Sequence, residues 1–298
     1  MAASEIIPTG KPLSIPYIDE DFYTSLTRII DELSKKEQEP VNGKEDLIRR
    51  AHTAWWSLVY KYSTCRLTKD DDILAAISGI ANFMEKPLND KYLGGLWGSA
   101  IMEGLLWQRH RRLIRPTFRP FPFRFRAPTW SWASMKGQIT LAYPSIQHAI
   151  DEGNFVFLAK LLDVQIESAG TEKIVQIENG YLSILGSLFD VAVPKAGKPI
   201  LKIGHYNFAI LLFMDDTDWW PVCREKGGTN VVCMPILLTS GLNVQLCGLV
   251  IELVSHGPLK GHFVRIGIFR SDIPVDSEDS EEIRLAFKER EKRIIVLG

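Results

Sequence analysis

The sequence predicts an α+β protein in which a helical N-terminal layer packs on a mostly antiparallel, β-rich C-terminal half. Apolar residues recur at helical spacing over roughly the first 110 residues, whereas short apolar runs separated by turn residues follow Trp130. Helices that precede strands, instead of alternating with them, argue against a parallel α/β sheet. We divide the chain into an irregular arm (1–18), a helical part with a connector (19–126) and a β-rich part (127–298), which we expect to fold as one cooperative unit.

Composition and charge exclude several classes of partner. The 298 residues are 46% hydrophobic and 24% charged, and the formal net charge is -1, so no global charge favours nucleic acid or an anionic membrane. The N-terminus lacks a basic stretch leading into an apolar one, and no apolar run reaches membrane-spanning length. We expect a cytoplasmic protein without a membrane span or a nucleic-acid partner.

Four helices are expected before the connector. They cover residues 19 to about 33, 45 to 62, about 68 to 85, and 92 to 110. The third begins with a capping box, in which the hydroxyl of Thr68 precedes the acid Asp71 by three residues; we prefer capping to metal binding for Asp71 and Asp72. Four glycines in the fourth helix lack the spacing of a nucleotide-binding loop, and close approach of another backbone explains them better: Gly94, Gly95, Gly98 and Gly104.

The connector from Arg109 to Arg126 alternates arginines with phenylalanines and prolines. Basic and aromatic residues together are also typical of surfaces that bind single-stranded nucleic acid. The neutral net charge and the prolines favour instead an extended loop, with phenylalanines packed inward and arginines facing solvent or carboxylates.

Nine β-like stretches follow, and a short charged helix is expected from Ser277 to about Lys292. The stretches are 138–143, 155–166, 174–177, 181–193, 209–214, 231–238, 245–254, 263–269 and 294–297. Asn179-Gly180 predicts a hairpin turn between two of them. In the motif Trp130-Ser131-Trp132, side chains that alternate along an extended strand would bring both indoles to one face.

The sequence contains no recognisable catalytic motif. Six histidines are dispersed, and no nucleophile elbow, zinc-binding helix motif or phosphate loop occurs, so catalytic residues stay unassigned and no cofactor or metal is expected. The four cysteines lack zinc spacing and are expected to be reduced thiols. Asp215, Asp216 and Asp218 precede Trp219-Trp220, and a loop explains these acids more simply than a functional site.

Four blocks of the sequence resemble fungal heterokaryon-incompatibility (HET) domain proteins. The third block, Arg126 to Ser134, is the most specific. The blocks are Trp56–Ile80, Tyr92–Trp107, Arg126–Ser134, and Gly248–Val250 with Phe263–Phe269. They resemble the region that follows the HET domain proper, and the Tyr-x-x-Leu-Ser-Tyr-x-Trp-Gly-like signature of that domain has no counterpart in these 298 residues.

Two functional hypotheses follow. In the first, narrowly preferred, a stand-alone HET-like protein of fungal secondary metabolism binds an apolar small molecule and acts as a cofactor-independent cyclase of Diels–Alder type, by shape and orientation. In the second, a non-catalytic recognition module in self/non-self signalling binds a HET-domain partner protein.

Each hypothesis has its own structural signature. A closed, dry cavity would favour the first hypothesis, and an exposed apolar patch with oligomerisation would favour the second. The candidate ligand-binding residues are Trp130, Trp132, Arg126, Tyr62, Trp97 and Trp219. Core packing is the alternative for each tryptophan ring.

Overall fold

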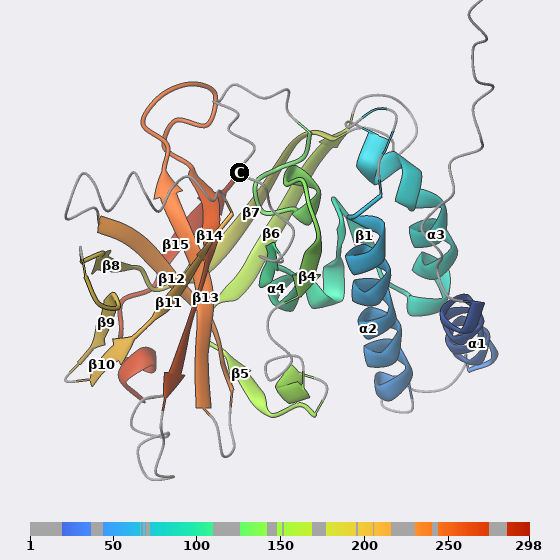
Figure 1. Ribbon diagram of the computed structural model, residues 1–298, viewed down its shortest axis with the longest axis horizontal. Coiled ribbons are helices and arrows are strands. Elements are labelled where there is room, and N and C mark those ends of the chain that lie inside the picture. Colours follow the sequence, from blue (N-terminus) through green and yellow to red (C-terminus); the bar gives the residue numbers. More distant parts are fainter. Residues whose placement is uncertain are drawn as a thin grey trace, which may run out of the picture.

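The α+β class is confirmed by the computed structural model, in which helices lie on one side and a large sheet on the other (Figure 1). The structure describes residues 20–36, 44–65, 67, 69, 72–109, 126–141, 148–150, 152–168, 177–194, 196–204, 206–215, 230–239, 244–273 and 285–298. The predicted arm (1–18) and most of the Arg/Phe/Pro connector lie outside these residues. The same holds for the first half of the predicted C-terminal helix, residues 277–284; in the described second half, residues 285–288 are helical.

Three amphipathic helices form the helical layer, as their periodicity predicts. They are α1 (Glu20–Lys35), α2 (Glu45–Tyr62) and α3 (Ile73–Leu88). The observed α2 has the predicted bounds and buries one apolar stripe that includes Ala51, Trp55 and Val59. The third helix begins later than predicted, after Asp72, whose side chain makes no capping bond. Thr68 and Asp71 lie outside the described residues.

The predicted fourth helix is wrong. Its residues form a two-stranded hairpin, β1 (Tyr92–Leu93) and β2 (Leu96–Trp97), followed by a 3-10 turn, the short helix α4 (Ile101–Gly104) and β3 (Trp107–Arg109). The reason lies in Gly94 and Gly95, whose φ angles of +59° and +104° belong to a turn and are incompatible with a right-handed helix.

The main sheet has nine strands and is antiparallel except where β14 meets β15. Its order is β5-β12-β13-β14-β15-β7-β6, with β11 beside β14 and β8 beside β12. The strands are β5 (Phe155–Phe157), β6 (Lys160–Ser168), β7 (Ile177–Gly186), β8 (Phe189–Ala192), β11 (Leu211–Met214), β12 (Asn230–Thr239), β13 (Val244–Leu253), β14 (Phe263–Ile273) and β15 (Arg293–Leu297). Since only two residues separate β5 from β6, the first and last strands of this order are successive parts of one chain segment, and the sheet curls back on itself.

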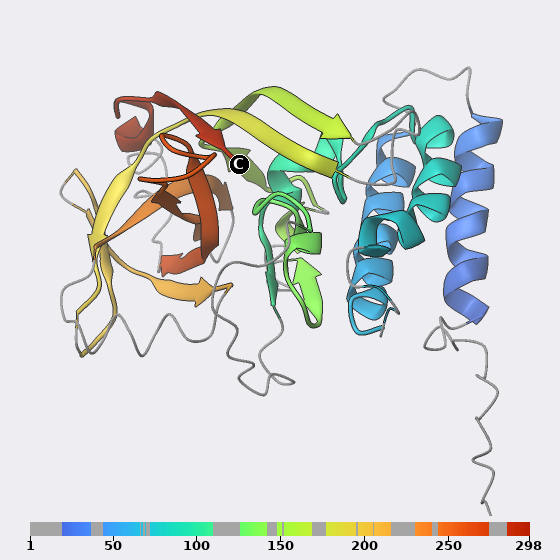
Figure 2. The same ribbon diagram turned by 90° about the horizontal axis from the view of Figure 1, so that it is seen from above.

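Two small antiparallel pairs accompany the main sheet. Strand β3 pairs with β4 (Ile139–Leu141), and β9 (Ile200–Ile203) pairs with β10 (Tyr206–Ala209). Figure 2 shows the β6–β7 hairpin reaching from the sheet toward the helices, above the region that contains β4 and α4. This hairpin therefore spans the two halves of the molecule.

The hairpin turn predicted at Asn179-Gly180 is also wrong, because β7 runs through both residues. A β-carbon on Gly180 would lie 2.5 Å from Pro128 Cγ and 3.0 Å from Trp130 Cζ2. The glycine is required at this point of the strand by the close approach of another chain segment, not by a turn.

Two clusters of buried apolar residues lie within the described residues. The larger one joins all three helices, the β1–β2 hairpin, residues 127–133 and strands β7, β12, β13 and β15. The second lies among β8, β9, β10, β12, β13 and the 285–288 helix. Continuity of the larger cluster explains how the helical layer and the sheet are held together.

The described part of the chain bears on two further predictions, one about the cysteines and one about membrane-spanning helices. Cys65 and Cys233 are free thiols, as predicted, and Cys223 lies outside the described residues. In the part of the chain that the structure describes, none of the helices is both long enough and apolar enough to cross a membrane.

Candidate functional site

The segment from Pro128 to Ser134, here called the anchor segment, lies between the helical layer and the sheet. It is not the predicted strand: residues 129 and 130 form a turn, and Trp132–Ser134 form a 3-10 helix. The hydroxyl of Ser131 accepts a hydrogen bond from the Ala133 N–H at 3.1 Å, and the Ser134 hydroxyl donates to the Ser131 carbonyl at 2.7 Å. Such local serine bonds favour a tight turn over an extended strand.

Trp130 connects the anchor segment to β7 and to β3. Its indole N–H donates to the Gly180 carbonyl at 3.1 Å, and its own carbonyl accepts a hydrogen bond from the Trp107 indole at 2.8 Å. The ring is 0% exposed and packs against Gly94. An exposed fraction of zero means that neither solvent nor a water-sized internal void touches the ring.

Trp132 connects the anchor segment to the β1–β2 hairpin and to α2. Its indole N–H donates to the Gly95 carbonyl at 2.7 Å, and its ring meets the edge of Tyr62 with centroids 6.2 Å apart. This ring is also 0% exposed. The close approach expected at the glycines is thus found at Gly94 and Gly95, but indole rings approach them, where a backbone was predicted.

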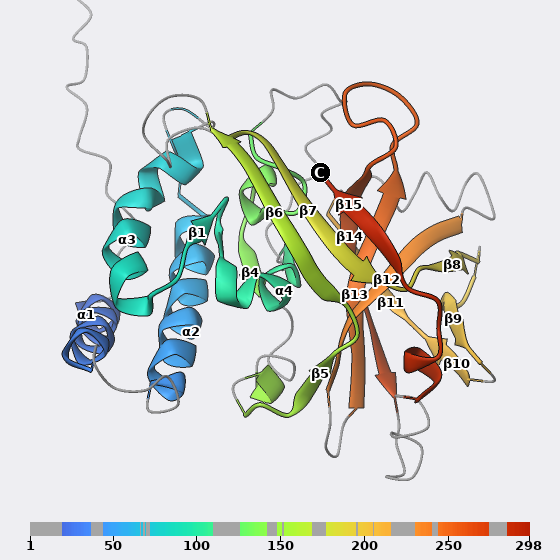
Figure 3. The ribbon, with the colours of Figure 1, turned by 180° about the vertical axis from the view of Figure 1, so that it is seen from behind.

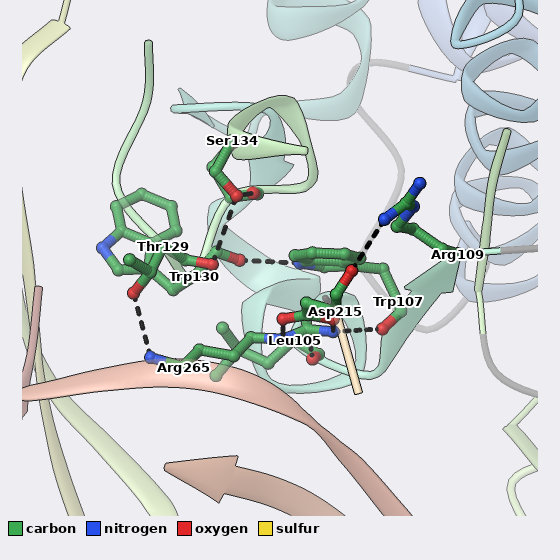
Figure 4. Close-up of polar contacts among 9 residues, drawn as sticks. Leu105, Trp107, Arg109, Thr129, Trp130, Ser134, Asp215 and Arg265 are labelled. Atoms are coloured by element: carbon green, nitrogen blue, oxygen red, sulfur yellow. Dashed lines mark hydrogen bonds and ion pairs between the residues drawn. The ribbon is translucent and has the colours of Figure 1, made fainter. Parts of the chain in front are cut away.

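A buried ion pair lies beside the anchor segment (Figure 4). The Arg265 guanidinium, from β14, donates to both carboxylate oxygens of Asp215: Nε to Oδ2 at 3.1 Å and Nη2 to Oδ1 at 3.0 Å. Its remaining donors reach the carbonyls of Leu105 at 3.0 Å and Trp107 at 2.6 Å, and its Cζ lies 3.3 Å from the Trp107 ring centroid. A single side chain of the sheet thus satisfies two carbonyls of the segment between α4 and β3.

Further contacts extend this polar network. Arg109 donates from Nη1 to the Asp215 carbonyl at 2.9 Å. The Thr129 hydroxyl donates to the Gly298 carbonyl and accepts from the Arg265 backbone N–H, the latter at 3.0 Å. The anchor segment, β3, β14 and the end of β15 therefore meet at one buried network.

Burial governs the titration of the ion pair. It lowers the pKa of Arg265 to about 10, and it raises the pKa of Asp215 above the ordinary aspartate value, against the opposing effect of Arg265 and Arg109. The two hydrogen bonds between the guanidinium and the carboxylate favour the charged form of each group, in opposition to burial. The Arg265 side chain is 0% exposed and the Asp215 side chain 8% exposed, so the pair is suited to holding elements together.

Arg265 and Asp215 were not among the residues chosen from the sequence. The available signal was an arginine inside the apolar stretch Phe263–Phe269, since a charged residue in a core strand needs a partner. For Asp215 the sequence favours a loop over a functional site, and Asp216, Asp218 and Trp219 lie outside the described residues.

The other candidate residues lie in two places: the aromatic core, and the contact between α2 and the anchor segment. Trp97 is 3% exposed and packs on Trp55 and Tyr92, with ring centroids 5.5 and 5.6 Å away. The half-buried Tyr62 donates its hydroxyl to the Ile73 carbonyl at 2.8 Å, and burial raises the pKa of Tyr62 to about 12, an effect that Arg126 opposes. The structure therefore brings Tyr62, Trp132 and Arg126 together, while Trp130 and Trp97 lie deeper in the core.

The aromatic cluster around Trp97 contains polar atoms that are buried without a hydrogen-bond partner among the described residues: Trp55 Nε1, Tyr92 Oη, Trp97 Nε1 and His52 Nε2. The ring of Trp55 meets Tyr92 and Trp97 edge-on, at interplanar angles of 73° and 78°. Edge-on rings in contact allow N–H to π contacts, which compensate a buried indole N–H in part.

An open hollow of about 500 Å³ lies on the opposite end of the sheet, over the second core. It is lined by Phe189, Asp190, Ala192, Ile200, Lys202, Gly204 and Arg290. None of the candidate ligand-binding residues that the structure describes lines this hollow. Trp130 and Trp132 are 0% exposed, so neither ring lines a water-sized cavity.

Metal chemistry has no geometric support in the described part of the chain, where no group of three or more histidine, cysteine, aspartate or glutamate side chains is arranged to hold an ion. No family model, curated protein or solved structure matches the chain. The function must therefore be argued from the geometry itself.

Proposed function

We propose that the protein is a non-catalytic recognition module of HET type, which acts in self/non-self signalling by binding a partner protein that carries a HET domain. The four sequence blocks that resemble the region after the HET domain motivate this proposal. The observation that carries it is an exposed apolar patch on the sheet, combined with complete burial of Trp130 and Trp132, two of the tryptophans that would otherwise form a ligand pocket.

The patch lies on the outer face of β6, β7 and β15, which are side by side on the near side in Figure 3. We call it the outer sheet patch and define it by Leu162, Leu185, Ile294 and Val296. Ile294 is 66% exposed and Leu162 45% exposed, and the other two are partly exposed. Ile294 lies directly opposite Leu185 in the strand register, so their side chains share one face. Apolar side chains that gather on a surface, instead of being scattered singly, are typical of protein-binding sites.

Small-molecule binding at the tryptophans has less support. Trp130 and Trp132 are 0% exposed, and both indole N–H groups are used in hydrogen bonds to glycine carbonyls. A ligand could reach these rings only if core contacts opened, which would cost several kcal/mol. Their observed role is to join the helical layer to the sheet.

A two-armed experiment tests the proposal. In one arm, the tagged protein is incubated with fungal lysate, and co-purifying proteins are identified by mass spectrometry. In the other arm, the protein is incubated with fungal terpenoid and polyketide extracts, and bound or converted compounds are sought by mass spectrometry. We expect a HET-bearing protein in the first arm and no retained compound in the second.

Matched variants locate the contact. Ile294→Asp alters the outer sheet patch, and Phe83→Asp alters an apolar side chain on α3 that is 51% exposed. We expect the first substitution to abolish co-purification and the second to leave it unchanged. Retention of a compound, with no HET-bearing partner, would overturn the proposal in favour of ligand binding.

A further inference from the structure

Strand β6 presents an edge to solvent that is complementary to itself. Among the described residues β6 pairs with β7 alone, so the N–H and C=O groups of its other edge have no strand partner. Its side chains alternate in exposure: Lys160, Asp163, Gln165 and Glu167 are exposed, and Leu161, Val164 and Ile166 are partly buried. Apart from Leu162, which belongs to the outer sheet patch, the strand therefore has a polar outer face and an apolar inner face.

We propose that two copies of the chain associate through this edge, by antiparallel pairing of β6 with β6 of the second copy about a two-fold axis at Val164. A two-fold axis perpendicular to a sheet places the residue on the axis opposite itself. Leu162 is skipped by the register between β6 and β7, where Leu161 and Asp163 face consecutive residues of β7. Skipping it on the other edge as well defines one register between the two copies.

From Lys160 to Glu167, that register matches every side chain except the skipped Leu162 with a suitable partner. The opposed pairs are Val164 with Val164, Asp163 with Gln165, Leu161 with Ile166, and Lys160 with Glu167. Each pair combines residues of the same face, and the symmetry gives two Lys160–Glu167 pairs of opposite charge. Within one chain, the Gln165 amide already donates to the Asp163 carboxylate at 2.8 Å, which shows that these two side chains are chemically suited to each other.

Charged residues and a bulge are also common devices that keep edge strands from pairing. Protection by charge requires only that the charges be present. Here their order matters, because a lysine at the start of β6 and a glutamate near its end become neighbours when the strand meets its own copy. A row of like charges would have protected the edge without this complementarity.

The inference deepens the proposed function, on which it rests for its biological meaning, by naming a second copy of the chain as one partner. Sheet continuation through β6 leaves the exposed face of Ile294 available to another protein. Self-association and binding of a HET-bearing partner are therefore separate properties, and the first is measured on the purified chain alone.

The test is sedimentation equilibrium of the full chain from about 1 to 100 μM, the range in which a modest interface is populated. We expect a monomer–dimer equilibrium. Lys160→Glu and Glu167→Lys each replace two attractive pairs by two repulsive ones, so each should weaken the dimer by about tenfold or more. The double variant Lys160→Glu/Glu167→Lys restores opposite charges and should bring dimerisation back to within about threefold of the unaltered chain.

Lys198→Glu serves as the charge control, because Lys198 is exposed and lies away from β6, between β8 and β9. Far-UV circular dichroism verifies that each variant is folded. A chain that stays monomeric at all concentrations would refute the inference, and so would a dimer that resists both single reversals or is not restored in the double variant. If the dimer is absent while a HET-bearing protein still co-purifies, only this inference fails.

Discussion

Arg265 of β14 and Asp215, the residue that follows β11, form a two-pronged ion pair in which the guanidinium Nε and Nη2 lie 3.1 and 3.0 Å from the two carboxylate oxygens. The same guanidinium reaches the carbonyls of Leu105 and Trp107, on the helical side of the molecule. The pair therefore contributes to the junction between the two halves of the fold, and its energetics can be tested directly.

Arg265→Met should lower the free energy of unfolding by about 3–5 kcal/mol, because it leaves the buried carboxylate of Asp215 and two carbonyls without their donor. The double variant Arg265→Met/Asp215→Leu should cost less than the sum of the two single changes, since no lone charge remains. Urea unfolding measures both effects. Arg293→Met, which breaks an exposed pair with Glu291, is the control and should leave stability unchanged.

Gly180→Ala should destabilise the fold by about 1–3 kcal/mol, because the added methyl group would overlap Pro128 and Trp130. Gly79→Ala is the matched control: Gly79 lies inside α3, and a β-carbon there meets no atom within 4 Å. The control should stabilise the protein by about 0.5–1 kcal/mol through helix propensity. Thermal unfolding of both variants measures the contrast, and equal effects would argue against the close approach at β7.

Asp90 makes stability depend on pH at the acid end. Burial raises the pKa of its carboxyl, but the His52 imidazole, whose Nε2 lies 3.7 Å from Oδ2, and hydrogen bonds from Ser99 and from the Lys91 N–H outweigh burial, and the pKa lies below the ordinary aspartate value. Because the folded-state pKa is lowered, the ionised Asp90 carboxylate stabilises the fold above the unfolded-state pKa of about 4. This stabilisation is lost as pH falls through the folded-state value.

Asp90→Asn removes that contribution. We expect the variant to be less stable than the unaltered chain at pH 7, and the difference between the two to shrink as pH falls below about 4. Urea unfolding at a series of pH values between about 6 and 3 measures the difference. A gap that stays constant with pH would show that the carboxylate is not the stabilising form.

Local patterns predicted the parts of the fold that depend on local sequence. In α2, five turns of regular apolar spacing leave only one way to bury Trp55 and Val59, so the predicted and observed bounds agree. Most strands of the β-rich half were found for the same reason, for example β13 and β14 from their apolar runs.

Local patterns failed where a tertiary contact decides the conformation. At Gly94 and Gly180 an indole ring of the anchor segment takes up the space that a side chain would need. The sequence near each glycine contains no sign of that ring. The Arg265–Asp215 pair joins residues 50 positions apart. Strand periodicity predicts Trp130 and Trp132 on one face of an extended strand, but serine bonds within the anchor segment, invisible to that periodicity, turn it into a 3-10 helix.

The most direct test of the account is the urea unfolding of Trp132→Phe. If Trp132 is a structural link between the anchor segment and the β1–β2 hairpin, the variant loses part of a buried ring and leaves the Gly95 carbonyl without its donor. The free energy of unfolding should then fall by about 2–4 kcal/mol. A change smaller than about 0.5 kcal/mol, the range of ordinary surface substitutions, would contradict the claim that this ring holds the anchor segment to the β1–β2 hairpin.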